Sequence, residues 1–212
     1  MRERLFLAID RHLLEDEQPS IYLQKQLDAG ALDTPPYTIF AAMANTKQNP
    51  KYHPEGDVFA HTLLVIDRAA NYRGESADPR AFMWAALLHD VGKPETTKRR
   101  KGKITAYNHD ITGATIARRF LENFTDEKLF VDRVVSLVRF HMQPFLVSIG
   151  RSEAALGKLA AESDYREVAL LSLCDRLGRL DVDETRERHL IEQFITQMEA
   201  LPISPAQTRV DY

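Results

Sequence analysis

Apolar residues recur three, four and seven positions apart along most of the chain, the spacing that places them on one face of an α-helix. Prolines and short polar runs, such as Thr34-Pro35-Pro36 and the stretch from Asn45 to Asp57, separate these segments. The predicted helices cover about residues 2–14, 21–29, 38–44, 57–72, 78–90, 110–123, 126–141, 152–162, 163–180 and 184–200, followed by an irregular tail. We therefore expect an all-α, single-domain helical bundle.

Strands contribute little to this prediction. No segment shows a convincing alternation of apolar and polar residues, and Lys103 to Tyr107 is at most a short extended piece. The basic run from Lys98 to Lys103 is expected to be a solvated loop, with attraction of an RNA backbone or a polyphosphate as the alternative. No aromatic residue interleaves this run, so it does not indicate a platform on which bases stack.

Composition narrows the class of protein. The 212 residues suffice for one good-sized core, and the net charge of −3 provides no general attraction to nucleic acid or to an anionic membrane. The single cysteine, Cys174, excludes an intramolecular disulfide and a zinc site built from cysteines. No apolar run approaches the length that spans a membrane, and the N-terminus does not read as a signal peptide. The expected location is the cytoplasm.

Histidines and aspartates interrupt several of the apolar helix faces. Aspartate is almost never fully buried without a partner, and a buried imidazole also needs one. The residues on such faces are His61, His89, Asp90, His141 and Asp175. One shared metal centre would satisfy all of these groups, whereas separate hydrogen bonds would require a partner for each.

Four further positions have two interpretations each. His109 stands at the start of a predicted helix, where Gly113 would allow close packing, but an exposed loop histidine is equally consistent. Lys93 provides a cation for phosphoryl oxygens or is a solvated lysine at a helix end. Arg176 and Arg179 clamp a phosphate or pair with surface carboxylates.

The order His61, His89-Asp90 and Asp175 resembles the HD superfamily of metal-dependent phosphohydrolases, whose H…HD…D pattern lies on separate helices of an all-α fold. Four segments are similar to the HD domain of bacterial CCA-adding enzymes (tRNA nucleotidyltransferases). They are His53-Pro-Glu-Gly-Asp-Val-Phe-Ala-His-Thr62, His89-Asp-Val-Gly-Lys-Pro-Glu-Thr-Thr97, His109-x-x-x-Gly113-Ala114 and Asp175-Arg176-x-Gly178-Arg179. The likeness covers about residues 49–180. Nothing before Pro50 resembles a nucleotidyltransferase domain, so nucleotide addition is not expected.

The resemblance implies a ligand set and its cofactor. His61, His89, Asp90 and Asp175 would hold one divalent ion, and Asp90 would bridge to a second ion held by His109 and His141. The expected cofactor is one or two ions of Mn, Fe, Co, Ni or Mg. Asp90 and Lys93 are the expected catalytic residues, and the substrate would contact Lys93, Arg176 and Arg179.

The expected domain organisation is a single HD-type domain over residues 1–212. It consists of an N-terminal helical extension (1–48), a metal-site core (49–180) and a C-terminal helix with a tail (181–212). The expected function is hydrolysis of nucleotide or RNA-end phosphoesters, including 2′,3′-cyclic phosphates, 2′-nucleotides and phosphomonoesters. The alternatives are a hydrolase of dinucleoside polyphosphates such as diadenosine tetraphosphate, and a non-catalytic HD-fold module that binds RNA or a protein. The only expected partner is a nucleotide or RNA terminus as substrate. No membrane and no stable nucleic-acid partner is indicated, and protein partners stay open.

Overall fold

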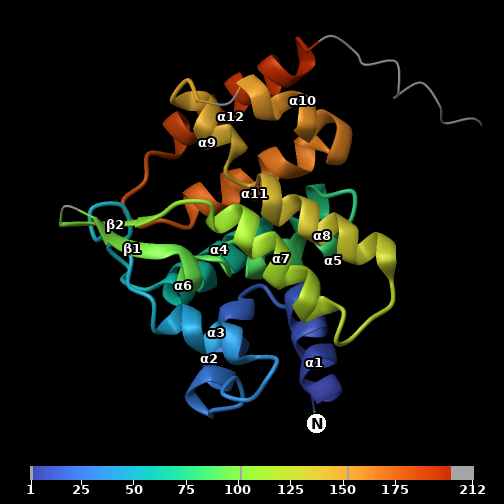
Figure 1. Cartoon of the computed structure of the whole chain (residues 1–212). Coiled ribbons are helices and arrows are strands. Elements are labelled where there is room, and N and C mark those ends of the chain that lie inside the picture. The colour runs from blue at the N-terminus through green and yellow to red at the C-terminus, as the bar shows by residue number, and fades with distance from the viewer. Residues whose placement is uncertain (1, 101, 152, 202–212) are drawn as a thin grey trace, which may run out of the picture.

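Helices make up most of the computed structural model, which describes residues 2–100, 102–151 and 153–201 (Figure 1). In chain order the elements are α1 (Arg2–Glu15), α2 (Pro19–Asp28), α3 (Thr38–Ala44), α4 (Val58–Tyr72), the 3-10 turn η1 (Arg73–Glu75), α5 (Pro79–Leu88), α6 (Lys93–Thr96), β1 (Thr97–Arg100), β2 (Lys103–Ala106), α7 (His109–Leu121), α8 (Lys128–Phe140), α9 (Gln143–Ser148), α10 (Glu153–Glu162), α11 (Tyr165–Leu177) and α12 (Glu184–Glu199). The predicted all-α bundle is confirmed. The predicted cap Ser152 and residues 202–212 of the predicted tail lie outside the described residues.

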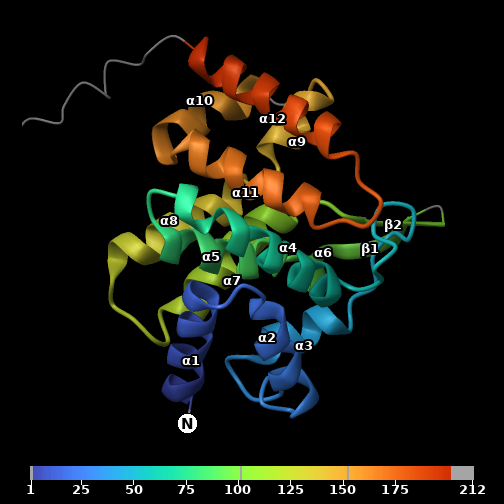
Figure 2. The ribbon, with the colours of Figure 1, turned by 180° about the vertical axis from the view of Figure 1, so that it is seen from behind.

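The middle of the molecule consists of α4, α5, α7, α8 and α11 (Figures 1 and 2). Helices α1 to α3 lie at one end, and α9, α10 and α12 lie at the other. Helix α5 is the centre of the core, because every residue from Ala81 to Leu88 is buried and the helix packs against α1, α4, α8 and α11. A helix that is apolar all round is stable only when other helices cover all its faces.

Aspartates begin several of the central helices by accepting hydrogen bonds from otherwise unpaired backbone N–H groups. Asp57 accepts from the N–H of Ala60 at 2.8 Å at the start of α4. Asp164 accepts from Arg166 at 2.8 Å at the start of α11. These local contacts lie within three residues of each other in the chain, which is why the sequence pattern located both helix starts.

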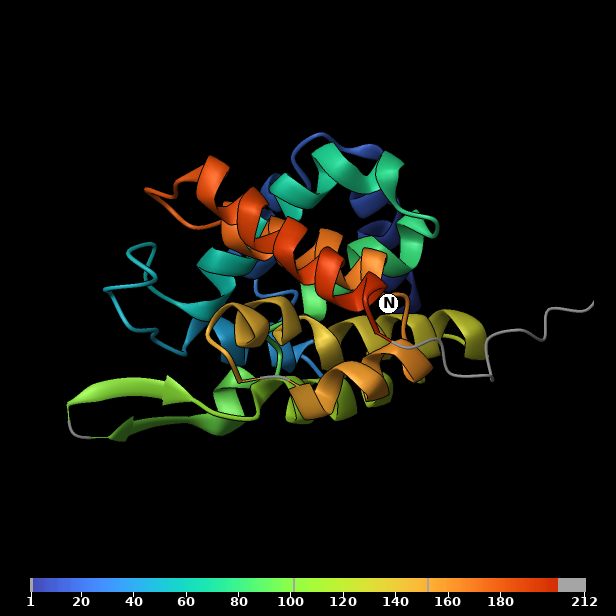
Figure 3. The same cartoon turned by 90° about the horizontal axis from the view of Figure 1, so that it is seen from above.

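Three features differ from the sequence-based expectation. The basic run expected to be a loop forms the antiparallel hairpin of β1 and β2, which projects from the helical body (Figure 3). Its residues are mostly polar, so no apolar alternation signals the strands. Helix α5 ends at Leu88, so His89 and Asp90 follow the helix instead of occupying its last turn. The short helices α6 and α9 were not predicted.

No helix in the described part of the chain is long and apolar enough to cross a membrane.

Candidate metal centre

Six side chains from five helix regions meet in the middle of the bundle. Each is at most 7 % exposed, although each carries an imidazole or a carboxylate. They are His61 in α4, His89 and Asp90 after α5, His109 at the start of α7, His141 after α8 and Asp175 in α11. The structure therefore brings together all of the predicted metal ligands. It also settles the position of His109, which is a buried residue and not an exposed loop histidine.

The first half of the cluster consists of His61, His89, Asp90 and Asp175. The Nε2 atom of His61 lies 2.9 Å from Oδ1 of Asp175. The Nε2 atom of His89 lies 3.2 Å from Oδ2 of Asp90 and 4.0 Å from the same Asp175 oxygen. These atoms are close enough to surround one small cation.

The second half shares Asp90 with the first. Its other oxygen, Oδ1, lies 3.3 Å from Nε2 of His109 and 3.9 Å from Nε2 of His141. The two Nε2 atoms are 3.2 Å apart. The two carboxylate oxygens of Asp90 thus face different sets of imidazoles.

Backbone carbonyls determine which ring nitrogen of these histidines carries the proton. The Nδ1 atoms of His89, His109 and His141 lie 2.7 to 2.8 Å from carbonyl oxygens three residues earlier in the chain. A carbonyl only accepts, so each Nδ1 donates, and in a neutral ring the Nε2 atom keeps its lone pair. Each of these rings, when neutral, therefore directs its Nε2 lone pair into the cluster.

The electrostatics of the second half suit a bound cation. Burial, with smaller contributions from neighbouring groups, lowers the pKa of His141 to about 4, and burial also lowers the pKa of His109. Both rings are therefore neutral at pH 7, and two lone pairs only 3.2 Å apart repel each other unless a cation lies between or beside them. Imidazole nitrogens with a shared carboxylate are a donor set that suits divalent metals. The residues fit the cofactor.

The carboxylates are charged despite their burial. Burial by itself would raise the pKa of Asp90, but Lys93 and then His89 hold it well below its usual range. Burial likewise opposes ionisation of Asp175, and Arg179 followed by His61 lowers the pKa of its carboxyl strongly. Burial lowers the pKa of His89, yet Asp90 and Asp175 raise it overall, so this half also favours a cation. The Nε2 atom of His89 has no hydrogen-bond partner within the described residues.

Residues 58–180, more than half of the chain, match the family of the HD domain. The chain belongs to the HD domain family. This assignment agrees with the H…HD…D order and with the helical fold that brings those residues together.

Curated relatives of this HD domain protein carry the name Multifunctional CCA protein. The relative from Pasteurella multocida is 34% identical over 190 residues, which cover 86% of this chain and 44% of that protein. The relative from Actinobacillus pleuropneumoniae serotype 5b is 30% identical over 184 residues, which cover 85% of this chain and 43% of that protein. The relative from Methylococcus capsulatus is 28% identical over 202 residues, which cover 93% of this chain and 40% of that protein. The chain thus spans less than half the length of these relatives.

Two cations border the ligands of the HD domain. The Nζ atom of Lys93 lies 2.6 Å from Oδ2 of Asp90 and donates to Oε1 of Gln48 at 2.6 Å. Lys93 is therefore not a solvated lysine at a helix end. Arg179 approaches Oδ2 of Asp175 to 3.6 Å. Both cations stand beside the carboxylates that would hold metal.

Arg176 pairs with a carboxylate, as the second of its two interpretations expected, but that carboxylate is buried and not at the surface. Its Nε atom forms an ion pair with Glu187 of α12, and its guanidinium stacks on Phe145. The side chain is buried between α9, α11 and α12. The position of Arg176 next to Asp175 in sequence does not place it beside the cluster, because successive residues of a helix point in different directions. We assign Arg176 a structural role.

Glu55 contacts a predicted metal ligand, and sequence reasoning gave it no role in the site. Its Oε1 atom lies 2.8 Å from Nδ1 of His61 and 2.9 Å from Nδ1 of His53. Burial opposes its ionisation, but His61 and then other hydrogen-bond donors lower its pKa to about 2. A carboxylate on the far nitrogen of a metal-binding histidine orients the ring and raises its basicity. The sequence signal for it was its place in the segment from His53 to Thr62, which resembles CCA-adding enzymes.

Glycines allow the two halves to approach each other. A Cβ atom on Gly92 would lie 2.1 Å from the backbone oxygen of His109 and 2.5 Å from the backbone nitrogen of Gly113. Only glycine fits there, and the contact draws α7 against the turn that carries Asp90. The predicted close packing at Gly113 is confirmed.

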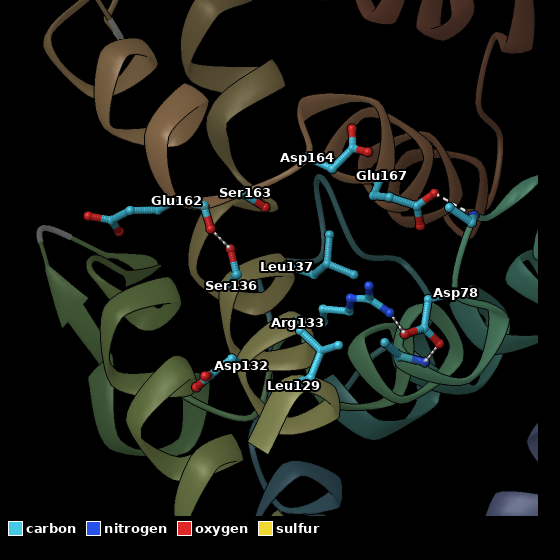
Figure 4. Close-up of a pocket in the computed structure, with 12 residues that line it drawn as sticks. Asp78, Leu129, Asp132, Arg133, Ser136, Leu137, Glu162, Ser163, Asp164 and Glu167 are labelled. Carbon is cyan, nitrogen blue, oxygen red and sulfur yellow. Dashed lines mark hydrogen bonds and ion pairs between the residues drawn. The ribbon is translucent and has the colours of Figure 1, made fainter. Parts of the chain in front are cut away.

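A cavity of about 260 Å³ opens beside the cluster. The loop after α3, Lys93, His109 and the hairpin line this cavity, and the lining residues include Lys47, Asn49, Tyr52 and Lys103. A second cavity, of about 340 Å³, lies among α5, α8 and the start of α11 (Figure 4). There Arg133 pairs with Asp78 at 2.5 Å, and Glu167 accepts from Ser76 at 2.6 Å. The first cavity is the candidate substrate site, because the cluster residue His109 and its neighbour Lys93 line it, whereas no cluster residue lines the second.

Proposed function

We propose that this protein is a metal-dependent phosphohydrolase that acts on nucleotide or RNA-end phosphoesters. The observation that carries the proposal is the set of three buried imidazole Nε2 atoms that lie 3.2 to 3.9 Å from the two oxygens of Asp90. Such a group of polar side chains is costly to bury by itself and suits two neighbouring cations.

The chain's own residues divide into two ligand groups. His61, His89, Asp90 and Asp175 would hold one ion, and Asp90, His109 and His141 would hold a second. When bound, such ions provide Lewis acidity that lowers the pKa of a water and screens charge on phosphorus. Glu55 keeps His61 oriented from behind.

Lys93 has the second role in this proposal. Its ammonium neutralises Asp90 and lines the adjacent cavity. It is therefore placed to face the phosphoryl oxygens of a substrate and to stabilise the negative charge that develops there. Arg179, on the other side of Asp175, is a weaker candidate for the same task because it is already close to a carboxylate.

The choice of substrate class rests on the resemblance to CCA-adding enzymes and on relatives named for CCA. The lysines that line the cavity are suited to a phosphoester. The pairing of His109 with His141 beside Asp90 keeps a second candidate open, the hydrolysis of dinucleoside polyphosphates.

Assays with separate substrates distinguish these functions. The protein, purified without chelator and analysed for metal, is offered 2′,3′-cyclic AMP, 2′-AMP and diadenosine tetraphosphate with Mn²⁺, Ni²⁺, Co²⁺ or Mg²⁺. We expect hydrolysis of the first two. Cleavage of diadenosine tetraphosphate alone would reject the first choice in favour of the second.

An Asp90→Asn variant tests whether the module is catalytic at all. Asn keeps the shape but removes the charge between the two groups, so turnover should fall by at least about a hundredfold while the fold is retained. Asp28→Asn, an exposed change on α2, is the matched control. Wild-type protein that binds metal but hydrolyses none of these esters would support a non-catalytic module.

A further inference from the structure

The β-hairpin carries an unpaired concentration of positive charge. Lys98, Arg99 and Arg100 of β1 and Lys103 of β2 are exposed, and no acidic residue occurs between Thr97 and Tyr107. Within the described part of the chain, none of these four cations takes part in an ion pair. By contrast, arginines on the helices, such as Arg80, Arg133 and Arg166, pair with carboxylates.

The register of the hairpin makes this charge costly to the protein alone. Arg100 lies directly opposite Lys103, and Lys98 is on the same face, two residues along β1. Like charges directly opposite each other across two strands destabilise the pair. An anion that lies across this face would relieve the repulsion, whereas the isolated protein gains nothing from it.

The hairpin is continuous with the candidate active site. Its residues from Lys103 to Ala106 line the same cavity as Lys93 and His109. Two exposed tyrosine rings adjoin it: Tyr107, whose ring lies under Arg100, and Tyr52, whose ring lies under Lys51. The surface therefore combines backbone-binding cations with rings on which bases can stack, the combination that single-stranded nucleic acid requires.

We propose that the hairpin, with Tyr52 and Tyr107, is a docking surface for a single strand of RNA whose 3′ end enters the cavity beside the metal centre. This inference rests on the proposed function and narrows its substrate from a free nucleotide to the end of a polynucleotide. An anionic membrane is a poorer match, because membrane-surface segments pair their cations with an exposed apolar face. On the hairpin, Ile104 is only partly exposed and Lys98, Arg99 and Arg100 occupy both faces of β1.

The test compares two triple variants of the full chain with bound metal. One is Lys98→Thr, Arg99→Thr, Arg100→Thr, which removes charges that do not line the cavity and keeps residues suited to a strand. The other is Arg2→Gln, Arg4→Gln, Arg11→Gln, which removes three exposed charges from α1, away from the hairpin. Unchanged thermal melting shows that both variants fold.

Binding is measured by fluorescence anisotropy with a short single-stranded oligoribonucleotide that ends in a 3′-hydroxyl. We expect the hairpin variant to bind about tenfold or more weakly at about 50 mM salt, and its salt dependence to be shallower by about 2 in the log–log slope, or roughly 0.7 per lost cation. The control variant should match wild type. Hydrolysis of 2′,3′-cyclic AMP should be equal in all three proteins, while hydrolysis of an oligonucleotide with a 2′,3′-cyclic phosphate end should fall in the hairpin variant alone.

The failure of each proposal has a distinct result. The wild-type protein could bind RNA, lose this binding in the hairpin variant, and yet hydrolyse no phosphoester. That result would support the docking surface and reject the proposed function. Equal binding and equal oligonucleotide turnover in wild type and hairpin variant would overturn the docking surface. So would equally tight, hairpin-dependent binding to vesicles that contain phosphatidylserine.

Discussion

Replacing Gly92 with alanine should separate the two halves of the metal centre without touching a ligand. The added Cβ would lie 2.1 Å from the backbone oxygen of His109, whereas ordinary contact begins at 3.4 Å, so the backbones must retreat by about 1.3 Å. Neither neighbouring atom belongs to a flexible side chain. Such overpacking typically costs about 1–3 kcal/mol of stability.

The displacement acts where α7 presents His109 to Asp90, across a distance of 3.3 Å. A misplacement of about 1 Å at a reacting centre can cost a hundredfold in rate. We therefore expect Gly92→Ala to lose activity by about that factor and to bind less metal in the second group, while His61, His89 and Asp175 keep their places.

The assay combines metal content by elemental analysis, thermal melting and turnover of the preferred ester. Gly74→Ala is the matched control, because a Cβ there would meet no atom within 4 Å. A Gly92→Ala protein with wild-type metal content and wild-type kcat would refute the reasoning that this contact sets the distance between the halves.

Three other expectations follow from single contacts. Glu55→Ala should weaken metal binding about 10–100-fold because His61 loses the carboxylate behind it, whereas the exposed Glu95→Ala should not; equal affinities in a calorimetric titration would contradict this. The pKa of His141 is lowered to about 4, and the unfolded chain binds that proton near pH 6.5, so the metal-free protein should lose stability as the pH falls from about 6.5 to 4. His141→Gln should flatten this part of the pH profile of the melting temperature, and an unaltered slope would count against it. Arg176→Ala should lower the free energy of unfolding, measured by chemical denaturation, by about 3 kcal/mol, because buried Glu187 on α12 loses its partner. The kcat per folded molecule should stay unchanged, and a large fall in kcat would support a contact between Arg176 and substrate.

Local signals in the sequence accounted for most helices. The apolar spacing located α4, α5 and α8, and aspartates placed the starts of α4 and α11 within a residue. Helix formation depends on contacts between residues three or four apart, so a linear pattern contains nearly all the information that it needs. The hairpin escaped this reasoning because its pairing joins polar residues whose partners are set by register and not by an apolar face.

By itself, the sequence determined that imidazoles and carboxylates interrupt apolar helix faces, because the helical periodicity places His61, His89, His141 and Asp175 on those faces. Only the tertiary structure decided which of these groups share an oxygen of Asp90, that Glu55 stands behind His61, and that Arg176 turns toward α12 instead of the cluster. The physical reason is distance along the chain. Contacts between residues three or four positions apart follow from helix geometry, but contacts between helices depend on how whole faces and close points such as Gly92 and Gly113 pack against each other.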